Sequence, residues 1–263
     1  MVKKQEHQAF GGETGAPYLK LMNELNNSFI FVSVAIPILN ESEREFDWEE
    51  GTDLILFEVP TIDAPYGMAK RSEEELQNLF RFYLKNGLYE AFLISTISRF
   101  EVFLLDLLRI IFTHKPKAIL HSEEETRQRG YEPPRLELRK ILDFHTHEDL
   151  VRYLTDDKLK NLGNKGAISI LEFFRKRFQI TEVDAEKLAI FAEVKATRDI
   201  LVHNENKIND QYLSKSGDKA RGEIGDSLTV DNAYFISSIS VMKRVATDLV
   251  KGVNRKFRQA PQR

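Results

Sequence analysis

The chain has 263 residues, of which 42% are hydrophobic and 30% are charged, so it can bury a substantial core in one large domain or in a main domain with a smaller companion. Its formal net charge of −3 at pH 7 excludes a global positive field that would draw it onto nucleic acid or an anionic membrane, and any polyanion site has to be local. The absence of cysteine excludes disulfides, thiol nucleophiles and cysteine-ligated zinc.

Residues 1–66 are expected to form an N-terminal segment with short strands. Two apolar, β-branched stretches, residues 29–39 and 53–62, flank a charged segment of the kind that reverses a chain, and they predict two strands that could pair as a hairpin. Pro37 and Pro60 predict edge strands or strand ends. The first stretch has only 11 residues, too few for a bilayer span of about 20. Because no apolar segment closely follows the N-terminal lysines either, we expect a cytoplasmic protein with no membrane partner.

Residues 67–263 change to helical periodicity and are expected to form a helical bundle. Ser72 and Glu75 have the spacing of a capping box. Two further pairs with this spacing, Thr146 with Asp149 and Thr181 with Asp184, predict two more helix starts. Helices are expected over residues 72–84, 89–112, 150–154, 156–162, 168–178, 181–203 and 231–250, with a break at Gly87.

Several short motifs carry no chemistry that the sequence supports. His145 and His147, with the acidic residues behind them, could be drawn as a metal site, but the capping pair at Thr146 and Asp149 already explains these polar side chains. The GGETG segment at Gly11 lacks the Gly-Lys-Ser/Thr ending of a phosphate loop, and no Gly-x-Ser-x-Gly motif occurs. We therefore expect neither a metal nor a cofactor.

One remaining pair, Arg198 and His203, stands at the predicted end of a helix. Five positions of about 100° each place the two side chains roughly 140° apart, so one helix cannot present both on one face. This spacing suits a histidine in the last turn, with Asn204 as the C-cap. There the helix dipole favours the protonated imidazole, and a histidine so placed can exchange protons near neutral pH.

The segment Arg198-Asp-Ile-Leu-Val-His203, followed by Asn204, resembles the Arg-x4-6-His motif of the HEPN superfamily, the higher-eukaryote and prokaryote nucleotide-binding domains. Members of that family often have a polar residue directly after the arginine, as this chain does. FEVFLLDLL at residues 100–108 is similar to the long second helix of many prokaryotic members. KINDQYL at residues 207–213 is similar to the segment that follows the motif in these members. The likeness covers residues 73–250. It implies a mainly α fold, an up-and-down helical bundle, beside the small N-terminal β element.

The resemblance also implies an activity. Active members of the family are metal-independent RNA endonucleases that pair as homodimers, so that two motifs face each other. A histidine can move the proton of the 2′-hydroxyl or of the leaving oxygen, and an arginine can stabilise the phosphate charge, which yields 2′,3′-cyclic phosphate and 5′-hydroxyl ends. The alternative is a catalytically silent HEPN module for dimerisation or RNA binding. Both the active and the silent form suggest a toxin or a phage-defence effector. Such a protein would be restrained by an antitoxin, by a nucleotidyltransferase partner or by its own N-terminal strands.

Accessory roles follow for neighbouring polar residues. Asp199 is expected to orient His203 or the partner's arginine, and Asn204 to contact phosphate. Glu101 either holds Arg198 from a neighbouring helix or forms a plain salt bridge of the bundle. The basic C-terminal tail either contacts phosphates or is a solvated terminus. Candidate RNA-binding residues are Lys195, Lys207, Arg255, Lys256 and Arg258.

Overall fold

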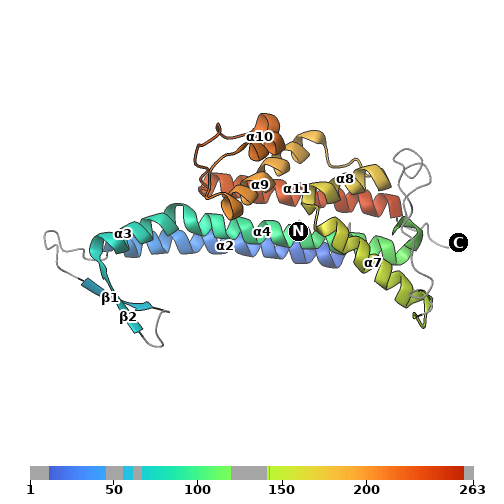
Figure 1. The fold of residues 1–263 in the computed structure, drawn as a ribbon, viewed down its shortest axis with the longest axis horizontal. Coiled ribbons are helices and arrows are strands. Elements are labelled where there is room, and N and C mark those ends of the chain that lie inside the picture. Colours follow the sequence, from blue (N-terminus) through green and yellow to red (C-terminus); the bar gives the residue numbers. More distant parts are fainter. Residues whose placement is uncertain (1–11, 46–55, 62–66, 120–140, 142, 258–263) are drawn as a thin grey trace, which may run out of the picture.

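A computed structural model describes residues 12–45, 56–61, 67–119, 141 and 143–257 (Figure 1). Helices dominate this part of the chain, and a small antiparallel sheet lies near its N-terminal end, which confirms the predicted mainly α fold. The elements in chain order are α2 (Gly15–Glu45), β1 (Leu56–Thr61), β2 (Gly67–Ser72), α3 (Glu73–Phe82), the π-helical turn η1 (Tyr83–Gly87), α4 (Leu88–His114), η2 (Pro116–Ile119), α7 (His147–Gly163), α8 (Gly166–Phe178), α9 (Ala185–His203), α10 (Asp210–Ser216), η3 (Gly217–Lys219) and α11 (Asn232–Phe257).

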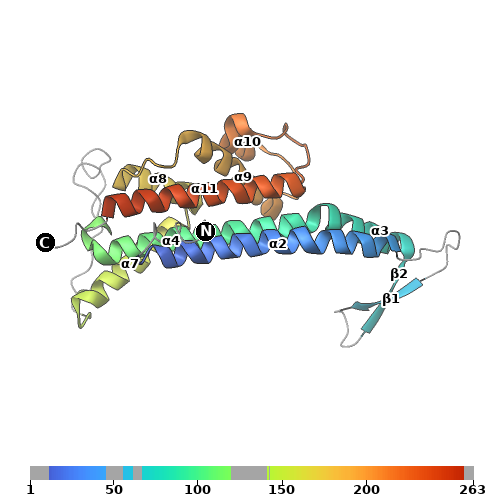
Figure 2. The same cartoon turned by 180° about the vertical axis from the view of Figure 1, so that it is seen from behind.

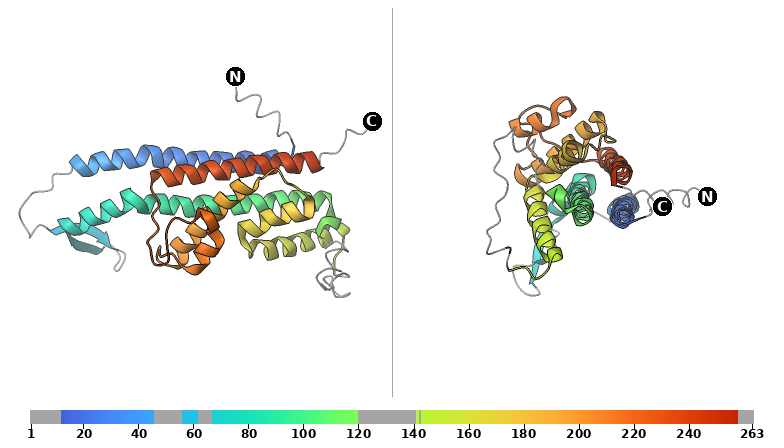
Figure 3. Two further views of the ribbon diagram at one scale, coloured as in Figure 1. Left: turned by 90° about the horizontal axis from the view of Figure 1, so that it is seen from above. Right: turned by 90° about the vertical axis from the view of Figure 1, so that its right-hand side faces the viewer.

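Four long helices form the core in two layers. In the end-on view of Figure 3, α2 and α4 lie side by side in one layer, and α9 and α11 lie on them in the other. The short helix α10 packs on the outside of α9, while α7 and α8 cover one end of α4. Aromatic rings join the layers, as in the contact of Phe100 on α4 with Phe191 on α9, whose centroids are 4.7 Å apart. One buried apolar cluster therefore spans the four long helices.

The strand predicted over residues 29–39 is wrong, because these residues belong to α2. Four residues of this helix, Leu21, Leu25, Val32 and Ile36, fall on one helical stripe and are at most 4% exposed. Burial of this stripe against the bundle outweighs the β-branched composition on which the strand was predicted. The first 45 residues thus include a main-core helix, about 46 Å long at 1.5 Å per residue.

The helix α2 also bears on the expectation of no membrane partner. Its stretch Gly15–Glu41 is long and apolar enough to cross a bilayer, judged by length and composition alone, and 22% of its apolar window is buried inside the protein. Core helices of globular proteins pass the same test, so the expectation stays a prediction.

The second predicted strand is confirmed as β1, within the predicted range 53–62. Its partner is β2, and the two pair antiparallel with Leu56 opposite Ser72 and Thr61 opposite Gly67. The boundary expected after residue 66 therefore falls inside this hairpin. The hairpin lies at the end of the molecule where α2 and α3 extend beyond the other helices, as Figure 2 shows from behind.

The helix start at Ser72 is confirmed as a capping box. The Ser72 hydroxyl accepts the Glu75 backbone N–H at 3.2 Å, and the Glu75 carboxylate accepts the Ser72 N–H at 2.9 Å. The predicted break at Gly87 is wrong, because η1 carries the chain into α4 without interruption. A Cβ atom at Gly87 would lie 2.9 Å from the Tyr83 ring, so this ring would have to shift to admit a larger residue.

The remaining helix starts are mostly as predicted. Thr146 caps α7 by accepting the Asp149 N–H at 3.1 Å, but α7 is one helix where two short ones were expected. At α9 the capping residue is Asp184, which accepts the Lys187 N–H at 2.8 Å, so Thr181 was wrongly given a share in that cap.

Candidate functional site

The helix α9 ends at His203, as predicted, and Asn204 is its C-cap residue. The Asn204 N–H donates to the Ile200 carbonyl at 2.9 Å, which closes the last turn. The next two residues, Glu205 and Asn206, have positive φ angles of 48° and 62°, the left-handed region that reverses the chain. The Asn204 side-chain amide then donates to the Lys207 carbonyl at 2.5 Å. This tight exit leaves the His203 side chain exposed at the end of the helix.

A pocket of about 300 Å³ opens beside His203, between the end of α9 and α10. Asn209 caps α10 by accepting the Tyr212 N–H at 2.9 Å, and the helix folds back along α9. Polar side chains from both helices line the pocket: Asp199 and His203 from α9, and Gln211 and Lys215 from α10. The volume is at the lower end of the range for small-molecule pockets.

Asp199 lies at the centre of a cluster of cations. Its carboxylate accepts hydrogen bonds from Lys195 at 2.6 Å, Arg198 at 3.2 Å and Lys215 at 3.2 Å. Burial alone would raise the pKa of Asp199, but hydrogen bonds and positive charge from Lys195 and Lys215 hold that pKa below its usual value. Of these three cations, Lys215 lines the pocket and could meet an anionic ligand there.

Arg198 does not line the pocket that holds His203. Its side chain is 22% exposed, and its Nε is buried without a hydrogen-bond partner among the described residues. Glu101 on α4 is 3.8 Å from Lys195, so its ion-pair partner is Lys195 and not Arg198. The structure thus places Asp199, His203 and Asn204 around one pocket and turns Arg198 away from it, as the 140° separation predicts.

Behind the pocket, a buried carboxylate organises a network that the sequence analysis missed. Glu193 is 4% exposed, and its Oε1 accepts from the hydroxyls of Thr197 at 2.7 Å and Tyr212 at 2.8 Å and from Arg221 Nε at 3.0 Å. Its Oε2 accepts from the Tyr234 hydroxyl at 2.7 Å. The network joins α9, α10, α11 and the loop before α11. We call these five residues the Glu193 clasp.

The charges of the clasp are mutually stabilising. Burial, followed by the negative charge of Glu193, raises the pKa of Tyr234 far above its usual value, so this phenol stays protonated and donates. The Arg221 guanidinium stacks 3.6 Å from the centroid of the Tyr234 ring. Burial by itself would lower the pKa of Arg221, but the nearby Tyr234 and Glu193 raise it, and the guanidinium remains charged.

The loop between η3 and α11 returns to the exit of α9. The Leu228 N–H donates to the Asn206 carbonyl at 2.8 Å, and Lys207 Nζ donates to the Ser227 hydroxyl at 2.7 Å. The Asn206 side chain reaches Glu90 on α4 at 3.3 Å. Burial raises the pKa of Glu90, and the bond from Asn206 partly opposes this shift. The residues after His203 are thereby fixed to two other parts of the bundle.

One sequence signal could have revealed the clasp. Glu193 falls on the same helical stripe as the buried residues Ala196 and Ile200, and an acidic residue on a core-facing stripe requires partners. Lys215 and Gln211 had no comparable signal, because they reach the pocket only through the fold-back of α10.

The candidate RNA-binding residues separate into two groups. Lys195 and Lys207 lie near the motif, although both already have intramolecular partners. Arg255 pairs at 2.7 Å with Glu182, which precedes the first residue of α9, and Lys256 is adjacent to it on α11. These two lie at the opposite end of α9 from His203, a distance of about 28 Å along 19 residues. Arg258 lies outside the described residues.

Comparisons with known proteins give no relative to this chain. No family model, curated protein or solved structure matches it. Among the described residues, no group of three or more His, Cys, Asp or Glu side chains could hold a metal ion.

Proposed function

We propose that this chain is a metal-independent RNA endonuclease of HEPN type, acting in a toxin or defence setting. The observation that carries the proposal is the position of His203, exposed at the capped end of α9 and beside a pocket that Lys215 also lines. A phosphodiester needs a local cation such as this one, because the chain as a whole is slightly acidic.

In this proposal His203 moves protons and the cations bind the phosphate. The imidazole takes the proton of the 2′-hydroxyl, or returns a proton to the leaving 5′-oxygen. The guanidinium of Arg198 and the ammonium of Lys215 stabilise the charge that builds on the phosphate oxygens. Asp199 holds both cations in place and does not contact the substrate. DNA lacks the attacking hydroxyl, so it would be bound without being cut.

The proposed site is shared between two copies of the chain. Arg198 and His203 leave α9 in different directions, and only His203 lines the pocket. A homodimer with its two-fold axis near the α9 ends would let Arg198 of one copy act with His203 of the other. Val202, which is 43% exposed beside the motif, offers an apolar contact for such a pairing.

A second candidate is a catalytically silent HEPN module that binds RNA or a partner protein. The contact of Arg198 with its neighbour Asp199 favours it, because this guanidinium is partly occupied within its own chain. In that case the cation cluster would bind RNA without cleaving it.

The test is RNA cleavage by the wild type and four variants, followed by end-group analysis. His203→Ala should lower the rate by roughly 10²- to 10⁴-fold, and Arg198→Ala should lower both rate and affinity. Exposed residues on α7 provide the controls, His147→Ala and Arg152→Ala, and these should leave cleavage unchanged. Cleavage should persist in EDTA, and an all-deoxy substrate should survive. Binding without cleavage would favour the silent module, and loss of cleavage in EDTA would refute the metal-independent mechanism.

Mixing the two inactive variants tests the shared site. Half of randomly assembled dimers contain one His203→Ala chain and one Arg198→Ala chain, and each such dimer has one intact site of two. The mixture should therefore recover about a quarter of the wild-type rate. No recovery on mixing, while the variants still dimerise, would show that each site belongs to one chain.

A further inference from the structure

Large apolar side chains are exposed on the part of the α2–α4 hairpin that extends beyond the bundle. We call this part the arm: residues 30–41 of α2 together with α3 and η1 (Figure 1). Its α3 helix contributes no buried residue, although it has an apolar side. Nine large apolar side chains of the arm are between 44% and 56% exposed: Ile30, Phe31, Val34, Ile38, Leu39, Leu79, Phe80, Phe82 and Tyr83.

On the side of α2 that faces away from the core, the apolar residues gather in the arm. At about 100° per residue, Ile30, Phe31, Val34 and Ile38 fall within one 100° sector of the helix. In the other half of α2 the same sector carries Lys20, Asn23 and Asn27. A solvated face would remain polar along its length, so the change from polar to apolar indicates that the arm is covered by another molecule.

The exposed apolar area of the arm, summed over these nine side chains, is comparable to that of a stable interface. Its four aromatic rings, each about half exposed, present roughly 300–500 Å² if a full aromatic side chain buries about 150–250 Å². The five aliphatic side chains bring the total toward the order of 800 Å² that each partner contributes to a standard protein interface. The largest apolar patch on a typical monomer covers about 300–600 Å².

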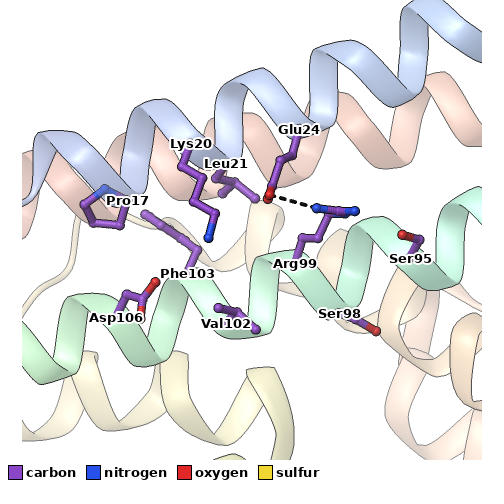
Figure 4. Close-up of a pocket in the computed structure, with 10 residues that line it drawn as sticks. All are labelled: Pro17, Lys20, Leu21, Glu24, Ser95, Ser98, Arg99, Val102, Phe103 and Asp106. Carbon is purple, nitrogen blue, oxygen red and sulfur yellow. Dashed lines mark ion pairs between the residues drawn. The ribbon is translucent and has the colours of Figure 1, made fainter.

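A groove of about 470 Å³ lies between α2 and α4 on the bundle side of the arm (Figure 4). The apolar side chains of Leu21, Val102 and Phe103 form part of its lining. Arg99 on α4 pairs across the groove with Glu24 on α2 at 2.7 Å. The remaining charged residues of the lining are Lys20 and Asp106, so the groove carries two positive and two negative charges. Two copies of this groove would therefore not repel each other by net charge.

We propose that the arm binds the arm of a second copy, antiparallel, so that two helical hairpins form a four-helix bundle about a two-fold axis near Val34. Residues 26–40 of α2 contain no charged residue, so two copies can approach along this stretch without burying a charge. An isologous antiparallel pairing covers the apolar surface of both copies at once.

The charges that follow residue 40 in the sequence and those that open α3 favour a protein partner over a lipid surface. Residues 41–53 contain seven acidic residues and one basic residue, and Glu73, Glu74 and Glu75 open α3. Anionic lipid headgroups repel such a sequence, whereas membrane-binding helices are usually basic. The antiparallel arrangement keeps the acidic starts of the two α3 helices apart.

This interface is separate from the proposed cleavage site and from the two-fold axis proposed near the α9 ends, so a chain that used both interfaces would assemble beyond a dimer. The α2–α4 layer lies on the side of the bundle away from α10 and the pocket beside His203, as the end-on view in Figure 3 shows. The effect of substitutions in the arm on dimerisation can therefore be measured by the mass of the protein in solution and by cross-linking, whether or not the chain cleaves RNA.

The absence of cysteine permits a direct test on the full chain. In the Val34→Cys variant the new thiol is the only one, and a short bismaleimide should join two chains through it because the residue lies near the two-fold axis. Ile224→Cys is the control, since Ile224 is 60% exposed in the loop before α11 and outside the arm. Cross-linked dimer from the first variant and none from the second is the expected result.

A second measurement reports the mass in solution. Val34→Asp combined with Ile38→Asp should halve the mass found by sedimentation, while Ile224→Asp should not change it, and circular dichroism should show equal helix content in all three. The proposal is overturned if Val34→Cys gives no cross-linked dimer, or if the arm substitutions leave the mass unchanged. It is also overturned if the wild type is monomeric and floats with phosphatidylcholine vesicles in an arm-dependent way.

Discussion

Replacement of Glu193 should be among the most destabilising single changes in this protein. Its carboxylate is 4% exposed and accepts four hydrogen bonds, one of them from the Arg221 guanidinium. Glu193→Ala removes all four acceptor contacts and leaves the positive charge of Arg221 without its partner. Breaking a buried ion pair by removing one side costs about 3–5 kcal/mol. That is a large share of the roughly 5–15 kcal/mol by which a folded protein is stable.

Glu193→Gln removes the negative charge but keeps the size and shape of the side chain, so it measures the contribution of the charge. It keeps the size of the side chain and one acceptor oxygen, so the loss should be about 1.5–3 kcal/mol, the range for a hydrogen bond to a charged group. The loss for both variants should include weaker packing of α10, because Tyr212 holds that helix against α9 through Glu193.

Urea unfolding followed by circular dichroism measures these losses. With a slope of about 3 kcal/mol per M, the midpoint should fall by roughly 1–1.7 M for Glu193→Ala and by roughly half as much for Glu193→Gln. Glu186→Ala is the matched control on the same helix, because Glu186 is 65% exposed and pairs with Lys219 at the surface. Its cost should stay below about 1 kcal/mol. Equal midpoints for Glu193→Ala and Glu186→Ala would refute the role assigned to the clasp.

Two further predictions concern packing and pH. Gly252→Ala should cost about 1–3 kcal/mol in thermal or urea unfolding, because the new Cβ would overlap with atoms of Ile180 and Glu182. Gly163→Ala should be nearly neutral, because the nearest atom to its new Cβ is 3.5 Å away. Equal effects of the two substitutions would contradict the packing argument. Because its pKa is depressed in the folded chain, Asp199 contributes stability that is complete above its unfolded value of about 4 and is lost as the pH falls through the folded value. The difference in unfolding free energy between wild type and Asp199→Asn should accordingly be constant near neutral pH and shrink below about pH 4. A difference that grows on acidification would show that the pKa of Asp199 is raised by folding and not lowered.

The sequence predicted those parts of the fold that depend on local chemistry. The caps at Ser72, Thr146 and Asp184 are set by side chains that bond to backbone groups within three residues, so their pattern is visible in one dimension. The end of α9 at His203 was predicted for the same reason. The composition of residues 29–39 was misleading, because the burial that makes them helical comes from α4 and α11, which are distant in the sequence.

The candidate site was predictable in part. Arg198, Asp199, His203 and Asn204 are adjacent in the sequence, and their separation around the helix follows from its period. Lys215 joins the site only because the left-handed residues after Asn204 reverse the chain and bring α10 back along α9. The partner of Glu101 likewise depended on the rotation of α9 relative to α4, which places Lys195 in its reach.

The π-helical turn η1 has a consequence for how this chain can change in length. A π turn holds one residue more than the α-helical turn that it replaces, and here it lies between α3 and α4. Deleting one residue between Tyr83 and Gly87 would allow regular α-helix to continue through this segment, and because one helical turn replaces another, α3 and the attached β-hairpin would keep nearly the same orientation about the helix axis. In related chains, a one-residue gap at this place should therefore be treated as the loss of a helical bulge and not as a rotation of the hairpin.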